Sequence, residues 1–271
     1  MDELEGWRTR VRESLPGFFT PLEVAASLPT TMARAAELAA AGAPEGTTVL
    51  AEEQTSGRGR LGRAWVAPAG SSLLLSVVLR PPLPREAVWL TVAAAGVALA
   101  GAVEAVAPAA VQVGLKWPND LELGGRKAAG LLAEAHLDGG RPTWVVLGMG
   151  VNVTQHAADL PAEVAARATS VAMAAGGPVD RGELLAAWAE RFLDGYRGLT
   201  AGEPGPLLAA YRERLVTLGR RVRAERVRAE PLVGTAVDLT GTGGLVIQTD
   251  AGARVELLAG DVHHLRPAPP A

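Results

Sequence analysis

Residues 54–70 read QTSGRGRLGRAWVAPAG, and the segment GRGRLG within them has the G-x-G-x-x-G spacing of a dinucleotide-binding turn. Such a turn follows a strand, opens a helix at its end, and needs an acidic residue about 20 positions further on. A strand is expected at 47–54, where TTVLAEEQ precedes the loop. After the loop, however, Pro68 and Gly70 interrupt any helix, and VVLRPP at 77–82 contains no carboxylate. The sequence therefore excludes a nicotinamide-dependent oxidoreductase of this kind.

The same loop alternates arginine and glycine, with Arg58, Arg60 and Arg63 standing between three glycines. Guanidinium groups match the oxygens of phosphates and carboxylates, and glycine lets backbone N–H groups approach a ligand closely. Glycine-rich loops also serve as lids that become ordered over a ligand. On the loop alone two interpretations stay open, a lid over an anionic ligand and a solvated basic turn.

Composition places the chain among ordinary globular proteins. It has 271 residues, of which 48% are hydrophobic and 20% charged, and its net charge is -3. This balance does not point to nucleic acid or to an anionic membrane surface. The sequence contains no cysteine, which excludes disulfides, thiol catalysis and thiolate metal sites. It also suits a reducing cytoplasm, which is the location that we expect.

Lysine, asparagine and isoleucine are nearly absent: two lysines, two asparagines and one isoleucine occur. Their codons are rich in A and T, so this usage indicates a G/C-rich gene in which arginine replaces lysine wherever only charge is needed. The remaining residues are Lys116, Asn119, Lys127 and Asn152. Arginine and lysine differ in geometry and acidity. We therefore predict that this cluster is retained for its chemistry, the alternative being chance survival at the surface.

Local patterns predict a mixed α+β main domain. Helices are expected at 30–42, 180–198 and 206–217, and strands at 47–54, 71–81, 111–120 and, as three strands joined by two Gly-Gly hairpin turns, 121–153. The apolar run at 88–111 is long enough to raise the question of a membrane span. It is rich in Ala and Gly, however, carries Glu104 and meets Pro108. We therefore expect a buried core helix.

From Gly219 onward, short Val/Leu runs alternate with Gly- and Asp-containing turns, which indicates a small all-β barrel of about 50 residues. The fold class that we predict is α+β, a mixed sheet with packed helices followed by this barrel. The domains are expected at 1–218 for the main domain and 219–266 for the barrel, with a tail at 267–271.

Four motifs occur in a fixed order: EQTSGRGRLGRAW (53–65), KWPND (116–120), RKAAGLLAE (126–134) and LGMGVNV (147–153). Together they closely resemble the biotin–protein ligases over roughly residues 28–266. The resemblance implies a biotin/lipoate ligase-like catalytic domain with an SH3-like C-terminal barrel. It further implies that ATP and Mg²⁺ convert biotin to biotinyl-AMP, and that biotin then passes to a lysine of the biotin carboxyl carrier protein of acetyl-CoA carboxylase.

The resemblance also assigns roles to residues. It implies that Lys127 is catalytic, contacting the biotin carboxylate and the α-phosphate, and that Arg60 helps to retain the adenylate. The implied biotin-binding residues are Thr30, Thr31, Gln54, Arg58, Gly59, Arg60, Lys127 and Gly130. The implied ATP- and adenylate-binding residues are Arg58, Arg60, Arg63, Trp65, Lys116, Asn119, Lys127, Asn152 and Arg266. Leu131 and Leu132 join Trp65 as candidates for an apolar wall.

Three positions leave alternatives open. Asp120 is either an indirect Mg²⁺ contact or a brace for its turn. Asn152 either reaches the nucleotide or caps a loop. At 30–32 this chain reads TTM where the family commonly has Ser-Thr-Asn, so Met32 lacks an amide and the recognition of the biotin ring stays open.

Two other functions compete with biotin ligation. Lipoate–protein ligases and octanoyl transferases share the architecture, but their loop signature lacks the GRGR repeat. A biotin-responsive repressor would need an N-terminal DNA-binding module, and only about 28 residues, without a basic stripe, precede Thr30. We therefore expect no DNA and no membrane partner, with a homodimer possible by resemblance. The histidines show no metal-ligand spacing, and on a strand His263 and His264 would face opposite sides.

Overall fold

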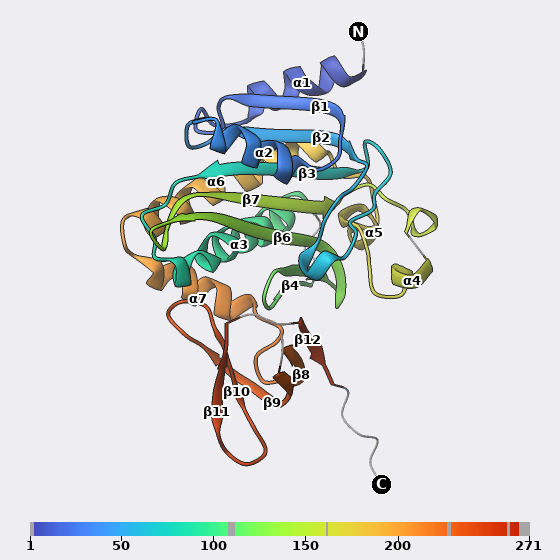
Figure 1. Ribbon diagram of the computed structural model, residues 1–271. Coiled ribbons are helices and arrows are strands. Elements are labelled where there is room, and N and C mark those ends of the chain that lie inside the picture. Colours follow the sequence, from blue (N-terminus) through green and yellow to red (C-terminus); the bar gives the residue numbers. More distant parts are fainter. Residues whose placement is uncertain (1–2, 108–111, 161, 227–228, 259–260, 266–271) are drawn as a thin grey trace.

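The computed structural model describes residues 3–107, 112–160, 162–226, 229–258 and 261–265, which form two separate sheets (Figure 1). The first sheet has seven strands in the order β1-β2-β3-β7-β6-β5-β4. Its strands are β1 (Leu22–Leu28), β2 (Thr48–Gln54), β3 (Ser72–Leu79), β4 (Val113–Lys116), β5 (Asp120–Leu123), β6 (Arg126–Asp138) and β7 (Arg141–Asn152).

The segments that connect the strands explain why this sheet contains both parallel and antiparallel pairs. Strands β1 and β2 pair in parallel because helix α2 (Thr31–Ala40) crosses between them, whereas the other neighbours are antiparallel. The two predicted Gly-Gly turns link β5 to β6 and β6 to β7, and all four glycines have positive φ. Glycine adopts such φ values without the steric cost that a Cβ brings, so these pairs suit tight hairpins. The predicted three-strand meander is confirmed.

Helices cover both faces of the first sheet (Figure 1). Helix α2 packs on β2, β3 and β7 on one face, while α3 packs on the other face against β4, β5 and β6. On the α3 face, α3 (Trp89–Val106) packs against α6 (Arg181–Thr200) and α7 (Pro204–Arg214), and α1 (Glu3–Ser14) packs against α6. The short helical segments are η1 (Arg60–Gly62), η2 (Arg85–Ala87), η3 (Ala157–Asp159), α4 (Ala162–Ala165) and α5 (Val171–Ala175).

Helix α3 is the centre of the main core. Together with the turn before it, it forms a stretch, 85–106, that is long and apolar enough to cross a membrane, yet 72% of an 18-residue apolar window within the stretch is buried inside the protein. Its small side chains let α6 approach closely, and the Trp188 indole N–H donates to the Ala95 carbonyl at 3.2 Å. The prediction of a buried core helix is confirmed for the described residues; 108–111 lie outside them.

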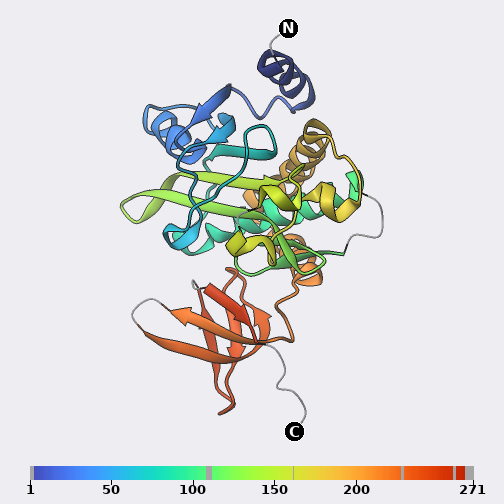
Figure 2. The same ribbon diagram turned by 90° about the vertical axis from the view of Figure 1, so that its right-hand side faces the viewer.

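The second sheet is antiparallel and lies beyond β4 and α7, at the opposite end of the molecule from α1 (Figures 1 and 2). Its order is β11-β10-β9-β8-β12, with β8 (Arg221–Arg226), β9 (Ala229–Leu239), β10 (Leu245–Gln248), β11 (Arg254–Leu257) and β12 (Asp261–His264). The all-β C-terminal unit is confirmed, and the boundary predicted at Gly219 falls between α7 and β8. Arg266 and the tail lie outside the described residues.

The elements α1 and β1 and the short helices α4 and α5 were not predicted from the sequence; of these, α1 and β1 are the longest. Helix α1 carries only a narrow apolar stripe, in which Trp7 and Val11 are buried, and β1 is a sheet edge with half-exposed residues. Such elements are stabilised by tertiary contacts more than by their own pattern. The Arg8 side chain, for example, donates from Nε to the Val24 carbonyl at 3.1 Å and so ties α1 to β1.

Candidate active site

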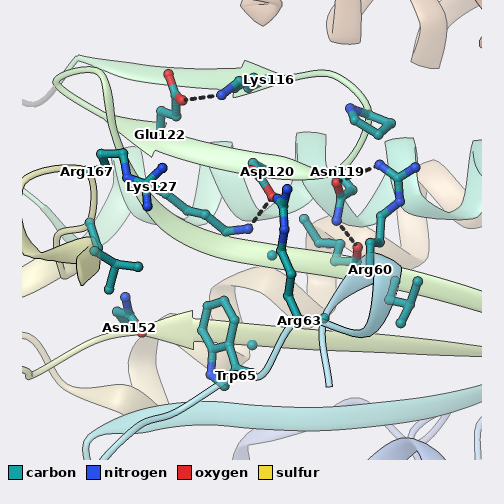
Figure 3. A pocket seen from close by; sticks show the side chains of 18 of the residues that line it. Arg60, Arg63, Trp65, Lys116, Asn119, Asp120, Glu122, Lys127, Asn152 and Arg167 are labelled. Carbon is teal, nitrogen blue, oxygen red and sulfur yellow. Dashed lines mark hydrogen bonds and ion pairs between the residues drawn. The ribbon is translucent and has the colours of Figure 1, made fainter. Parts of the chain in front are cut away.

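A cavity of about 1100 Å³ lies over β6 and β7 and extends to the C-terminal domain (Figure 3). Its walls come from the loop after β2, the turn between β4 and β5, the segment after α4, and the end of β12. The structure brings to this one cavity every described residue that the sequence analysis placed in the site: Thr30, Thr31, Gln54, Arg58, Gly59, Arg60, Arg63, Trp65, Lys116, Asn119, Asp120, Lys127, Gly130, Leu131, Leu132 and Asn152.

The Gly/Arg loop folds back on itself as an irregular hairpin over the cavity. Trp65 N donates to the Gly57 carbonyl at 2.9 Å, and Gly59 N donates to the Arg63 carbonyl at 2.7 Å. The reversal lies at Leu61, whose φ of 57° is left-handed and strained for a residue with a Cβ. Only a three-residue turn of helix forms before the chain becomes extended. The exclusion of a dinucleotide-binding turn is confirmed.

Glycines on β6 and β7 make room for the Trp65 ring. Gly130 and Gly150 are register partners, and a Cβ added at Gly150 would lie 2.8 Å from Trp65 Cε2, closer than real Cβ atoms come. The indole therefore lies on bare backbone, and no larger residue fits beneath it. Trp65 Nε1 is buried without a hydrogen-bond partner in the described structure. A buried donor of this kind is available to a ligand.

One end of the cavity is neutral and already hydrogen-bonded. Gln54 Oε1 accepts from Thr31 N at 2.7 Å and from Thr31 Oγ1 at 3.2 Å, and Thr31 Oγ1 lies 2.9 Å from Ser76 Oγ. Thr30 is the N-cap of α2, with its hydroxyl accepting from Met32 N at 3.3 Å. Ser76 was missed in the sequence, because a single serine inside a buried strand gives no signal by itself.

Met32 completes the wall at this end. A Cβ added at Gly148 would lie 2.7 Å from Met32 Cγ and Sδ, so the thioether lies directly on the β7 backbone. An apolar, flexible side chain thus fills the position where the family commonly has an amide.

The other end of the cavity carries the predicted catalytic lysine. Lys127 Nζ lies 2.6 Å from Asp120 Oδ1 and 5.9 Å from the centroid of the Trp65 ring (Figure 3). The register shift between β5 and β6 at Leu121/Glu122 allows a lysine on one strand to reach a carboxylate on its neighbour. The lysine backbone is held from its other edge, where Lys127 N donates to the Arg167 carbonyl at 2.8 Å.

Asn119 joins the Gly/Arg loop to the turn after β4. Its Oδ1 accepts from Arg60 Nη1 at 3.3 Å, and its Nδ2 donates to the Leu131 carbonyl at 2.7 Å. One amide thereby links an arginine of the Gly/Arg loop on one side to the β6 backbone on the other.

The Asn152 side chain is hydrogen-bonded to two neighbouring segments of the chain. It is buried, its Nδ2 donates to the Thr169 carbonyl at 3.0 Å, and its Oδ1 accepts from Gln155 at 3.2 Å. Both ends of the amide are thus engaged within the protein. Of the two interpretations, the geometry favours the loop brace, although the residue also lines the cavity.

A third group of side chains lines the cavity where β4 and β5 face the C-terminal domain, which itself contributes Arg220 and His264. Lys116 Nζ pairs with Glu122 Oε1 at 3.6 Å, and burial raises the pKa of Glu122, an effect that Lys116 opposes. Burial and the charges of Lys116 and Arg220 lower the pKa of His264 to about 4. His264 is therefore neutral at physiological pH, with Nε2 3.3 Å from Thr217 Oγ1.

The charges that line the cavity are strongly unbalanced. Seven basic side chains face two carboxylates, Asp120 and Glu122. Five of the seven were predicted, whereas Arg167 and Arg220 were missed because single arginines in an arginine-rich chain give no signal. Such an excess suits a ligand with several negative charges, such as a nucleoside triphosphate together with a carboxylate.

Two protein families match the chain. The family described as "Biotin/lipoate A/B protein ligase family" matches residues 24–152, and "Biotin protein ligase C terminal domain" matches residues 217–265. The first match contains the Gly/Arg loop, the turn after β4 and Lys127; the second contains the C-terminal sheet.

Individual relatives agree with these matches. The chain is 40% identical over 250 residues to a biotin–[acetyl-CoA-carboxylase] ligase of Mycobacterium tuberculosis, covering 90% of this chain and 89% of that protein. It is 34% identical over 228 residues to the bifunctional ligase/repressor BirA of Bacillus subtilis, covering 84% and 69%. The structure of a biotin protein ligase from Aquifex aeolicus in complex with biotin and ATP is similar with a TM-score of 0.77 and 27% identity, covering 92% and 100%.

Proposed function

The chain belongs to the biotin protein ligase family, and we infer from this that it uses ATP to activate biotin and ligates the biotin to a carrier protein. The observation that carries the assignment to this site is the cavity itself. A neutral, hydrogen-bonded end around Thr31 and Gln54 continues into a cationic end around Lys127. Biotin has the same polarity, a neutral bicyclic ring at one end and a carboxylate at the other.

We propose that Lys127 acts where the two anions meet. In the first step a carboxylate oxygen of biotin forms a bond to the α-phosphorus of ATP, and the bond to pyrophosphate breaks. The ammonium group neutralises charge on both oxygens, and positioning with electrostatic stabilisation accounts for most of such a reaction. The 2.6 Å pair with Asp120 keeps the ammonium aimed into the cavity in the absence of substrate.

In the second step the ε-amine of the carrier lysine attacks the acyl carbon of biotinyl-AMP. An amide bond forms, the acyl–phosphate bond breaks, AMP leaves, and the amine loses a proton. Between the two steps the adenylate must be shielded from water. The lid loop, anchored by Arg60 on Asn119, covers this part of the cavity.

The ring of biotin is proposed to lie beside Trp65 and Leu132, which line the cavity near the Gln54–Thr31 pair. The Leu131 side chain, predicted as part of this wall, is instead buried in the core on the α3 face of the sheet, because side chains alternate along β6 and Gly130 faces the cavity. The unpartnered N–H of Trp65 supplies a donor within an otherwise apolar wall. Arg58 and Gly59 belong to the same end by resemblance.

Mg²⁺ is proposed as the cofactor that accompanies ATP. Within the described ranges, no three His, Asp or Glu side chains gather as a metal-binding group, and both carboxylates of the cavity pair with lysines. This suits Mg²⁺, which keeps several waters and is held by one or two carboxylates together with phosphates. Asp120 and Glu122 are the side chains that would hold it, with phosphate oxygens taking over the two lysines.

The partner of the second step is proposed to be the biotin carboxyl carrier protein of acetyl-CoA carboxylase. The name of the relative from Mycobacterium tuberculosis supports this choice. We place the reaction in the cytoplasm, with no membrane partner. A homodimer formed through an edge of the first sheet is also part of the proposal, since β1 is an edge strand; sedimentation equilibrium tests it.

Operator binding is not part of the proposed function, although two relatives are named bifunctional ligase/repressor. Within the described residues, helix α1 packs through Trp7 and Val11 against the first domain. A gel-shift assay with biotin, ATP and upstream DNA tests this, and a specific complex would overturn it.

The decisive assay measures transfer of biotin to a carrier domain in the presence of ATP and Mg²⁺. We expect biotin to support pyrophosphate exchange with ATP and lipoate not to support it. EDTA is expected to abolish exchange and excess Mg²⁺ to restore it. If lipoate supports pyrophosphate exchange and biotin does not, the protein is a lipoate ligase of the same superfamily and the proposal is wrong.

A further inference from the structure

Trp117, in the turn after β4, connects the two domains. Its side chain is 1% exposed, and its indole Nε1 donates to the Gly243 carbonyl at 2.9 Å. Its backbone N–H donates to Thr217 Oγ1 at 3.2 Å. Gly243 lies in the β9–β10 turn of the C-terminal domain and Thr217 in the linker that leads into β8, so the turn that holds Trp117 is tethered both to the C-terminal domain and to the segment that enters it.

The packing around these tethers leaves no room for adjustment. Gly243 has a φ of +89°, and a Cβ added there would lie 1.8 Å from Trp89 Cε3. The Trp89 indole in turn donates to the Pro118 carbonyl at 2.8 Å. The β9–β10 turn, the start of α3 and the turn after β4 therefore form one interlocked contact.

The same turn carries two groups of the proposed active site on its other side. Asn119 accepts from the lid arginine, Arg60, and Asp120 pairs with Lys127. Only one residue lies between Trp117 and Asn119, and only two lie between Trp117 and Asp120. Any shift of the indole therefore moves the anchor of the lid and the partner of the catalytic lysine together.

We propose that the C-terminal domain positions the lid and the catalytic lysine through the Trp117 tethers, with Trp117 and Thr217 as positioning residues. The inference rests on the proposed function. It gives the C-terminal sheet a role in the chemistry that does not require the sheet to contact biotin. The biotin-ring end, built from β2, α2 and β3, is independent of these tethers, so binding of the ring and chemistry at the carboxylate are expected to respond differently.

Trp117→Phe tests the proposal because it removes the indole donor while keeping an aromatic ring in the core. Trp188→Phe is the matched control, since it removes an equally buried indole donor, bonded to the Ala95 carbonyl, far from the turn. We expect Trp117→Phe to lower kcat for biotinyl-AMP formation by about tenfold while KM for biotin changes by less than about twofold, since small misplacements of catalytic groups are costly. The control is expected to leave both constants unchanged.

A second pair of variants distinguishes a loss of positioning from a loss of stability. Thr217→Val removes the acceptor of Trp117 N, and Thr48→Val removes a comparably buried hydroxyl at the start of β2. Thermal unfolding measured on all four variants separates lost stability from lost positioning. A merely structural role for Trp117 predicts that kcat follows Tm across both pairs.

Trypsin cleavage of the lid gives a readout that does not depend on activity. Arg58 and Arg63 are exposed in the loop, and weakening of the Asn119 anchor is expected to speed cleavage there in Trp117→Phe but not in Trp188→Phe. Equal cleavage and equal kcat in this pair would overturn the inference. Absence of biotin-dependent exchange in the unmodified protein, with the cleavage difference present, would overturn the proposed function instead and leave the tethering of the lid established.

Discussion

The two ends of the cavity are built on different principles. At the ring end, Thr31, Gln54 and Ser76 satisfy one another with neutral hydrogen bonds, in a place that is already buried. At the phosphate end, Lys127 and Lys116 are paired with carboxylates, and the cations outnumber the acids. The first end is complete before ligand arrives, whereas the second end holds its charges with partners that phosphate oxygens can replace.

This difference fits the proposed roles of the two ends, one for the biotin ring and one for the phosphates. A neutral ring is recognised by fixed donors and acceptors, whose cost of ordering is met during folding. A polyanion requires cations, and burying them without partners would be unfavourable. Asp120 and Glu122 supply such partners to Lys127 and Lys116. Substitutions at the two ends are expected to separate binding of biotin from the chemical step.

Lys127→Ala is expected to have the largest effect. Biotin-dependent pyrophosphate exchange should fall by about 1000-fold, since removing a group that stabilises charge in the transition state costs about 100- to 1000-fold. Arg126→Ala, one residue earlier on β6 and exposed, is the matched control and should leave exchange unchanged. Exchange that survives in Lys127→Ala would remove the residue from its catalytic role.

Arg60→Gly tests the lid at the phosphate end. Loss of the guanidinium removes the bond to Asn119 Oδ1, and release of biotinyl-AMP should rise by about tenfold or more, because hydrogen bonds to charged groups contribute about 1.5–3 kcal/mol. Labelling of bystander lysines measures the release. Leu61→Gly adds the same backbone freedom but keeps the arginine; bystander labelling as strong as that of Arg60→Gly would show that loop flexibility alone is responsible.

Gln54→Ala tests the ring end. The Thr31 backbone N–H loses its acceptor, so KM for biotin should rise by about tenfold, as expected for an unsatisfied buried donor, while kcat changes little. Glu53→Ala, the neighbouring exposed residue on β2, provides the control. If kcat falls and KM for biotin stays constant, the proposed division of the cavity into a ring-binding end and a reaction end is wrong.

His264 gives the smallest effect, a pH dependence of stability. Its folded pKa, about 4, lies below the ordinary value of 6.5, so the unfolded chain binds more protons between these values. The free energy of unfolding should therefore decrease as pH falls from about 6.5 to about 4. Urea unfolding at several pH values should show a weaker decrease in His264→Gln. The exposed His136→Gln variant should retain the full decrease, and identical profiles for the two variants would contradict this account.

Most of the helices and strands, and most of the residues that line the cavity, could be predicted from the sequence. Strong local signals, such as the Gly-Gly turns and the apolar α3, predicted their elements correctly, since each depends on residues close together in the chain. Helix α1 and strand β1 were missed because distant contacts stabilise them. Arg266 lies outside the described residues, so its role stays a prediction, as do the individual roles within the site.

By itself the sequence determined the chemistry that is available: ordered motifs around Arg60, Asn119 and Lys127, and a loop that cannot open a helix because Pro68 and Gly70 follow it. Only the tertiary structure decided the pairing of these groups. The pairing of Lys127 with Asp120 depends on a register shift between strands, and the tethers of Trp117 come from residues about 100 and 126 positions away. Spacing along a chain reveals which side chains share a strand or a turn, but contacts between distant segments arise only when the two sheets pack together.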